Sequence, residues 1–120
     1  MDEKVARIID SLVSMTEDGK LEWKYTNTEN SYQLELDAAT LVISFSEWVP
    51  LSNQEDCYSL IMYNGTGKPI ELVSCSKEDD KPDEYSLLSR LYSLSKESTN
   101  KRNTTIDKIL SELSLKDLPF

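Results

Sequence analysis

The fold is decided by Lys20-Leu21-Glu22-Trp23-Lys24-Tyr25, Tyr32-Gln33-Leu34-Glu35-Leu36 and Leu41-Val42-Ile43-Ser44-Phe45. Apolar and polar residues alternate within each segment, and short polar links separate the segments. Period-two alternation between tight loops is typical of an antiparallel meander with one buried face. We therefore expect three consecutive strands within residues 20–46.

The register of these strands follows from keeping the large apolar side chains on one face. A polar loop at 27–30 places Tyr25 opposite Tyr32 and Trp23 opposite Leu34. A loop at 37–40 would place Leu34 opposite Ile43. A slip of one residue would turn a strand's apolar set to solvent, so we expect these pairings.

Two further strands are expected at residues 57–63 and 69–76, joined by a turn with Gly67 in the left-handed conformation. The third and fourth strands should pair Ile43 with Leu60. Across the last hairpin we expect Leu60 opposite Leu72.

The same register places Cys57 opposite Cys75 on the outer face of the sheet. Both a disulfide and two free thiols fit this geometry. We expect free thiols, because cytosolic proteins rarely keep disulfides.

Helical periodicity flanks the strands. Asp2 can cap a helix over residues 3–17, with Gly19 as its C-terminal stop. A second helix is expected over residues 83–98. After a polar break, Thr104 or Thr105 should cap a third helix, whose core stripe is Ile106, Ile109, Leu110 and Leu113.

These elements predict an α+β fold. It is a five-stranded antiparallel β-meander with one N-terminal and two C-terminal helices packed on one face. A chain of 120 residues is expected to form a single domain, over residues 1–120.

Candidate interaction residues lie in two places. Val42, Ile61 and Val73 are expected as a small apolar stripe on the outer sheet face. Trp48 and Leu51 are unusually apolar for the link at 47–56, which either folds back over a sheet edge or forms an exposed contact patch.

A second kind of site is a pocket between sheet and helices, near Trp23, Tyr25 and Tyr92. Core packing is the default interpretation of such aromatic residues. The alternative is a small-ligand pocket.

The residues that usually carry chemistry are scarce. The chain has no histidine, two cysteines and three glycines, and it has no glycine-rich phosphate loop. Glu78-Asp79-Asp80 does not match a calcium loop and is interpreted as a solvated linker. We therefore expect a protein that is not an enzyme, with no catalytic residues, no metal and no cofactor.

The formal net charge is −9, from 22 acidic and 13 basic residues. This charge argues against nucleic-acid binding and suits a basic protein partner. A homodimer is compatible with the same surfaces. No apolar run approaches the length of about 18 residues that a membrane span needs. The acidic start lacks a signal-peptide pattern, so we expect no membrane contact and a cytoplasmic location.

The segments Gly19-Lys20-Leu21-Glu22-Trp23, Asn30-Ser31-Tyr32, Asn64-Gly65-Thr66-Gly67-Lys68 and Leu88-Ser89-Arg90-Leu91-Tyr92 resemble a group of small bacterial proteins of unknown function. The resemblance implies a bacterial or phage setting. Its motifs are structural, so it implies no activity and no functional residues.

The leading functional hypothesis is a non-enzymatic, acidic protein-interaction module, such as an immunity factor, an inhibitor or an accessory subunit. The alternative hypothesis is a small-ligand-binding protein that uses the pocket between sheet and helices.

Overall fold

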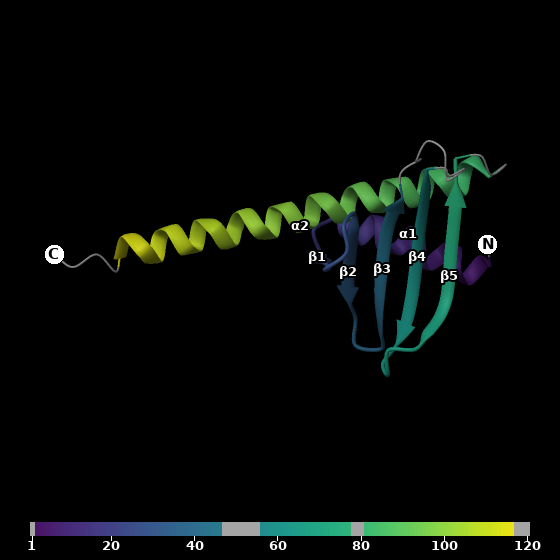
Figure 1. The fold of residues 1–120 in the computed structure, drawn as a ribbon, viewed down its shortest axis with the longest axis horizontal. Coiled ribbons are helices and arrows are strands. Elements are labelled where there is room, and N and C mark those ends of the chain that lie inside the picture. The colour runs from purple at the N-terminus through teal and green to yellow at the C-terminus, as the bar shows by residue number, and fades with distance from the viewer. Residues whose placement is uncertain (1, 47–55, 78–80, 117–120) are drawn as a thin grey trace.

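The computed structural model describes residues 2–46, 56–77 and 81–116, with side chains up to Ser114. The elements in chain order are α1 (Glu3–Glu17), β1 (Lys24–Tyr25), β2 (Ser31–Glu35), β3 (Ala39–Ser46), β4 (Cys57–Asn64), β5 (Pro69–Ser76) and α2 (Pro82–Lys116). The strands form one antiparallel sheet in the order β1-β2-β3-β4-β5 (Figure 1). The predicted α+β class and five-stranded meander are confirmed.

The first helix follows its sequence signals. Asp2 is the N-cap of α1, and its side chain accepts a hydrogen bond of 2.7 Å from the Lys4 backbone N–H. Gly19 adopts a φ of 75°, the left-handed conformation that ends the helix. The predicted bounds of this helix are confirmed.

Two of the predicted registers are confirmed and a third is displaced. Tyr25 pairs with Tyr32, and Ile43 pairs with Leu60. The predicted pairing of Leu34 with Ile43 is wrong, because Leu34 pairs with Leu41. Leu36 and Ala39 exchange backbone hydrogen bonds of 2.8 and 3.4 Å, which closes a two-residue turn instead of the longer loop. The shift of two residues keeps every side chain on its predicted face.

The predicted register between β4 and β5 is wrong by one residue. Leu60 pairs with Val73 rather than with Leu72, and Cys57 pairs with Ser76 rather than with Cys75. The ladder is irregular between Met62 and Tyr63, as expected for a β-bulge. β5 has one extra residue at this point. Every later residue of β5 therefore lies on the face opposite to the predicted one.

The prediction of two C-terminal helices is also wrong. One continuous helix of 35 residues, α2, runs through the predicted break. The hydroxyls of Thr104 and Thr105 do not cap a new helix. They donate to the carbonyl oxygens of Asn100 and Lys101 one turn earlier, at 2.9 and 3.0 Å. Helix propensity is a weak guide, and here it is overridden.

Both helices lie on the same face of the sheet (Figure 1). The core between them is built from α1, β2 to β5 and the first half of α2. Its largest fully buried side chains include Trp23, Tyr32, Ile43, Leu60 and Leu91. Ser98 of α2 ties the segment before β1 to this core, because its Oγ accepts a bond of 3.1 Å from the Trp23 backbone N–H.

The second helix crosses the strands and extends past the β1 edge of the sheet (Figure 1). Strands lie about 4.8 Å apart, so five of them span roughly 20 Å. A helix of 35 residues is about 52 Å long at 1.5 Å per residue. The C-terminal part of α2 therefore has no sheet beneath it. Within the described residues, no helix has the length and apolar character needed to cross a membrane.

Candidate functional site

The outer face of the sheet carries an apolar row across three strands. Val42 of β3 pairs with Ile61 of β4, which pairs with Leu72 of β5. We call these three residues the outer-face row. Both helices lie on the opposite face, and Leu72 is 60% exposed. Val42 and Ile61 are half-buried and lie on the predicted face.

The prediction that Val73 belongs to this row is wrong. Val73 pairs with the buried residue Leu60, is only 8% exposed and belongs to the hydrophobic core. The bulge in the β4–β5 ladder is the physical reason, since it moves Leu72 to the outer face in place of Val73. Trp48 and Leu51, the other two residues of the predicted surface, lie outside the described residues.

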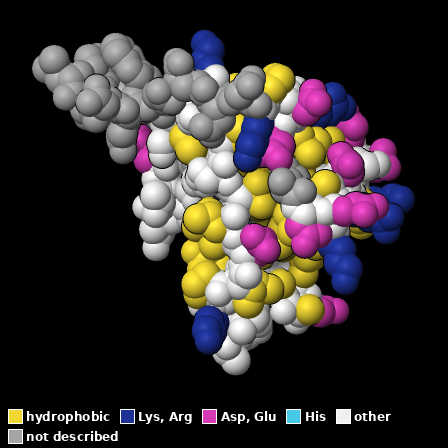
Figure 2. Space-filling view, turned by 90° about the vertical axis from the view of Figure 1, so that its right-hand side faces the viewer, with side chains coloured by type: hydrophobic (Ala, Val, Ile, Leu, Met, Phe, Trp, Pro, Cys, Tyr) yellow, Lys and Arg dark blue, Asp and Glu magenta, His cyan; other side chains and the backbone are white. Residues whose placement is uncertain are grey.

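The apolar area extends along the β5 side of the molecule. Ile70, next to the bulge, is 59% exposed. Seen from the β5 side, hydrophobic side chains form a band along the sheet that contains few charged groups (Figure 2). The sequence prediction missed Ile70 and Leu72. No periodic signal separated them from Val73 and Cys75, because β5 has apolar residues in both phases of the alternation.

The predicted ligand-pocket residues differ in burial: Trp23 lies in the core, Tyr92 is half-buried and Tyr25 is 58% exposed. Trp23 is fully buried, and its indole Nε1–H donates a hydrogen bond of 3.0 Å to Thr16 Oγ1. The ring of Tyr32 lies between the other two, with centroids 5.2 Å from Tyr25 and 5.5 Å from Tyr92. The ligand-pocket interpretation of these residues stays a prediction.

Burial has an electrostatic consequence inside this aromatic cluster. It raises the pKa of Tyr32 above the ordinary value of 10.0, and the neighbouring Tyr25 and Tyr92 raise the pKa further. The pKa of Tyr85 is raised for the same first reason, with a contribution from Tyr58. Both shifts disfavour the phenolate form of these two side chains.

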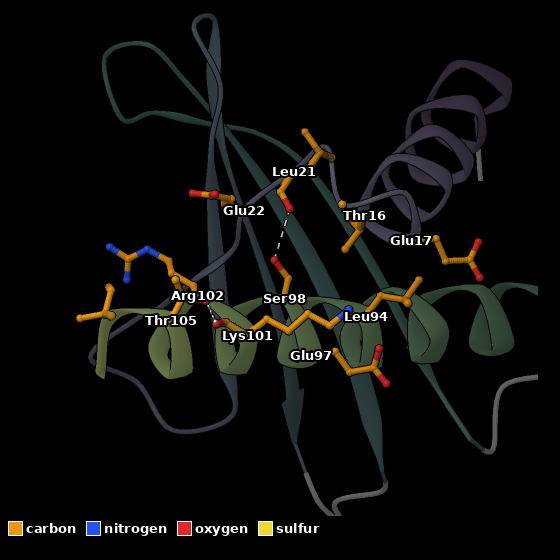
Figure 3. Close-up of a pocket in the computed structure, with 12 residues that line it drawn as sticks. Thr16, Glu17, Leu21, Glu22, Leu94, Glu97, Ser98, Lys101, Arg102 and Thr105 are labelled. Carbon is orange, nitrogen blue, oxygen red and sulfur yellow. Dashed lines mark hydrogen bonds between the residues drawn. The ribbon is translucent and has the colours of Figure 1, made fainter. Parts of the chain in front are cut away.

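A hollow of about 660 Å³ lies where α1 ends beside the middle of α2 (Figure 3). Its lining includes Leu21 and Leu94, and Ser98 Oγ donates to the Leu21 carbonyl oxygen at 3.3 Å. Its walls carry charges of both signs, from Glu17, Glu22, Glu97, Lys101 and Arg102. At its far end, the wall formed by Thr105 and Ile106 continues into the uncovered part of α2.

The two cysteines lie on opposite faces of the sheet, and no disulfide joins them. Cys57 faces outward, with its Sγ 3.2 Å from Ser74 Oγ, whereas Cys75 is fully buried on the core face. The expectation of free thiols is confirmed, although the predicted pairing of the two residues is not. Within residues 2–46, 56–77 and 81–116, no three His, Cys, Asp or Glu side chains gather as metal ligands would.

The clearest residues that sequence reasoning misplaced are Ile106, Ile109, Leu110 and Leu113 of α2. Their spacing predicts a core-facing stripe, but all four are exposed. The periodicity correctly identifies an apolar helix face, and it does not indicate whether that face meets the same chain or another. Comparison with protein-family models, curated proteins and solved structures gives no match to this chain.

Proposed function

We propose that this chain is a non-enzymatic protein-interaction module of bacterial or phage origin, and that it binds its partner through the outer-face row. The observation that carries the proposal is the exposure of Leu72 beside Ile61 and Val42 on a face to which neither helix contributes. Exposed apolar groups that adjoin across strands are typical of protein contact sites.

The chemistry of the partner follows from charge. With a net charge of −9, the chain attracts a basic surface and repels an acidic one. Such complementarity mainly raises the association rate and the selectivity, whereas burial of Leu72 and Ile61 would supply affinity. We therefore propose a basic protein with an apolar centre to its binding surface, as an immunity factor, an inhibitor or an accessory subunit would bind.

The absence of histidine from the sequence supports a binding role over a catalytic one, since the commonest general base is missing.

The test is affinity capture from host lysate at low and at physiological salt, followed by quantitative mass spectrometry. We compare the wild type with Leu72→Ser and with Ile8→Ser as a matched control. Ile8 is an isoleucine of α1 that is 42% exposed and lies far from the outer-face row in the chain.

The expected result is one basic protein that binds the wild type and Ile8→Ser, and that is lost with Leu72→Ser and as salt rises. A partner that binds Leu72→Ser as well as the wild type would show that the outer-face row is not its binding surface. A partner that is acidic, or insensitive to salt, would contradict the proposed electrostatic complementarity.

A further inference from the structure

The end of α2 carries an apolar stripe that no described element covers. We call Ile106, Ile109, Leu110 and Leu113 the tip stripe; they are between 38% and 58% exposed. Every residue from Asn103 to Ser114 is exposed, and this part of α2 projects beyond β1 (Figure 1). A helix that stands alone in water is normally polar all round. The tip stripe therefore needs an occupant.

The spacing of the stripe indicates that the occupant is a helix. The residues of α2 that face the core and the tip stripe recur at alternating steps of about four and three residues. One such series runs through Leu88, Tyr92, Ser95, Thr99, Arg102, Ile106, Ile109 and Leu113, and it is flanked by Leu91 of the core and Leu110 of the tip stripe. This repeat is the pattern by which two helices pack along one seam. The chain itself covers the seam only as far as Thr99, which is 1% exposed.

The intrinsic stability of this part of α2 gives a second reason for a partner. Residues 98–105 read Ser-Thr-Asn-Lys-Arg-Asn-Thr-Thr, in which six of the eight are poor helix formers. Helices in proteins draw most of their stability from packing of an apolar face. A helix that continues through this segment, with its apolar face uncovered, would gain that packing from a second helix.

We infer that the occupant is α2 of a second copy of this chain, packed antiparallel to the first. In this arrangement Ile106 lies opposite Ile109 of the second copy, and Leu113 lies beside the stem of its Arg102. Glu112, near the tip of one helix, then approaches Lys101 and Arg102 of the other. A parallel pair would instead bring together identical charges, and it would crowd two sheets at the same end.

The hollow beside α1 fits this arrangement. Arg102, Thr105 and Ile106 line it on the side toward the tip of α2, and Leu21 and Leu94 also line it. Because the two helices run antiparallel, the tip of each one reaches the base of the other, where the hollow opens. Leu113 and Glu112 of the second copy would close this end, with the carboxylate against the basic wall. The hollow is thus incomplete in a single copy.

The exposed area predicts a weak rather than an obligate dimer. The exposed fractions of the tip stripe add up to about two whole side chains in each copy. Stable dimers of standard size bury about 800 Å² per partner, which requires many more residues. After the entropic cost of association, an interface of this size is expected to have a dissociation constant on the order of 100 μM.

The test is sedimentation equilibrium of the full chain at concentrations from about 1 μM to about 1 mM, a range that brackets the expected constant. We compare the wild type with Ile109→Ser, Leu113→Ser and the control Ile8→Ser. We expect the wild type and Ile8→Ser to dimerise alike, and the two tip variants to dimerise at least tenfold more weakly. Urea unfolding of each variant, followed by Trp fluorescence, checks that the sheet and its core remain folded.

Charge reversal tests the antiparallel arrangement. Glu112→Arg and Arg102→Glu should each weaken the dimer, and the double variant should restore most of the loss. A wild type that stays monomeric throughout would overturn the inference, as would a dimer that survives both Ile109→Ser and Leu113→Ser. Single reversals that weaken the dimer without rescue by the double variant would overturn the antiparallel pairing. The outer-face row takes no part in this test, so the proposed function can fail or stand separately.

Discussion

The register of β5 can be tested by comparing two neighbouring substitutions, Val73→Ala and Leu72→Ala. Val73 pairs with Leu60 on the core face and is 8% exposed, whereas Leu72 lies on the outer face and is 60% exposed. Val73→Ala removes two buried carbons at about 0.8 kcal/mol each. With the cavity left behind, the free energy of unfolding should fall by about 2 kcal/mol.

Leu72→Ala removes one carbon more, but most of that side chain is already in water. The free energy of unfolding should therefore fall by less than about 1 kcal/mol, even when the lost cross-strand contact with Ile61 is included. The larger side chain thus costs less to remove, which is the opposite of what residue size alone would give. The predicted register, with Leu72 opposite Leu60, requires the reverse order.

Urea denaturation measures both changes. For an m value of about 2 kcal/mol/M, the midpoint should fall by about 1 M for Val73→Ala and by less than about 0.5 M for Leu72→Ala. Protein concentration must be the same for all variants, because any self-association adds to apparent stability. A midpoint for Leu72→Ala at or below that of Val73→Ala would refute the assigned register.

Three further predictions concern buried polar groups. Thr16→Val leaves the indole N–H of Trp23 without its acceptor. Urea melts should show a free energy of unfolding that is lower by about 1–3 kcal/mol. An unchanged value would mean that the N–H finds another partner. A thiol reagent should label Cys57 quickly and Cys75 only after unfolding. The labelling of Cys57→Ser should therefore have no fast phase. Fast labelling of that variant would contradict the burial of Cys75. Above pH 10 the unfolded chain releases the Tyr32 proton before the folded chain does, so stability should fall with a slope of up to about 1.4 kcal/mol per pH unit. Tyr32→Phe should flatten this slope in urea melts at several pH values, and an unchanged slope would assign it to other groups.

The meander was predictable because its sequence pattern is unambiguous where it matters. In β2, β3 and β4 most of the large apolar side chains occupy one phase, so the face that they share is the one expected to be buried. The pattern does not distinguish registers that differ by two residues. The observed register between β2 and β3 differs from the predicted one by two residues. A two-residue turn at 37–38 competes with the longer loop, and periodicity cannot distinguish the two.

The end of the sheet and the last helix were not predictable in the same way. In β5, Ile70 and Leu72 compete with Val73 and Cys75 for the core, and the bulge that decides between them leaves no residue signature. In α2, the polar segment 98–105 predicts a break from local propensity alone. The apolar repeat on either side keeps one phase through that segment, which is the longer-range signal for a continuous helix.

The bulge in the β4–β5 ladder also limits how much of the candidate site could be predicted. Val42 and Ile61 could be assigned to the outer face because they alternate with the larger apolar sets of β3 and β4, which take the core face. The third member of the outer-face row depends on the bulge, so Leu72 could not be chosen over Val73 from the pattern. Exposure of the tip stripe depends on the width of the sheet, which no local pattern encodes.

The order of the elements along the chain also determines how the protein folds. Each strand pairs with its neighbour in sequence, so the meander can assemble stepwise through hairpins, of which only the one between β3 and β4 has a link as long as ten residues. The apolar face, in contrast, is closed by contacts such as that between Trp23 and Ser98, which are 75 residues apart. Until α2 docks, Ile43 and Leu60 face water, and a partly folded chain is prone to aggregate through that face. Docking of α2 is therefore the step at which this protein either completes its core or is lost to aggregation.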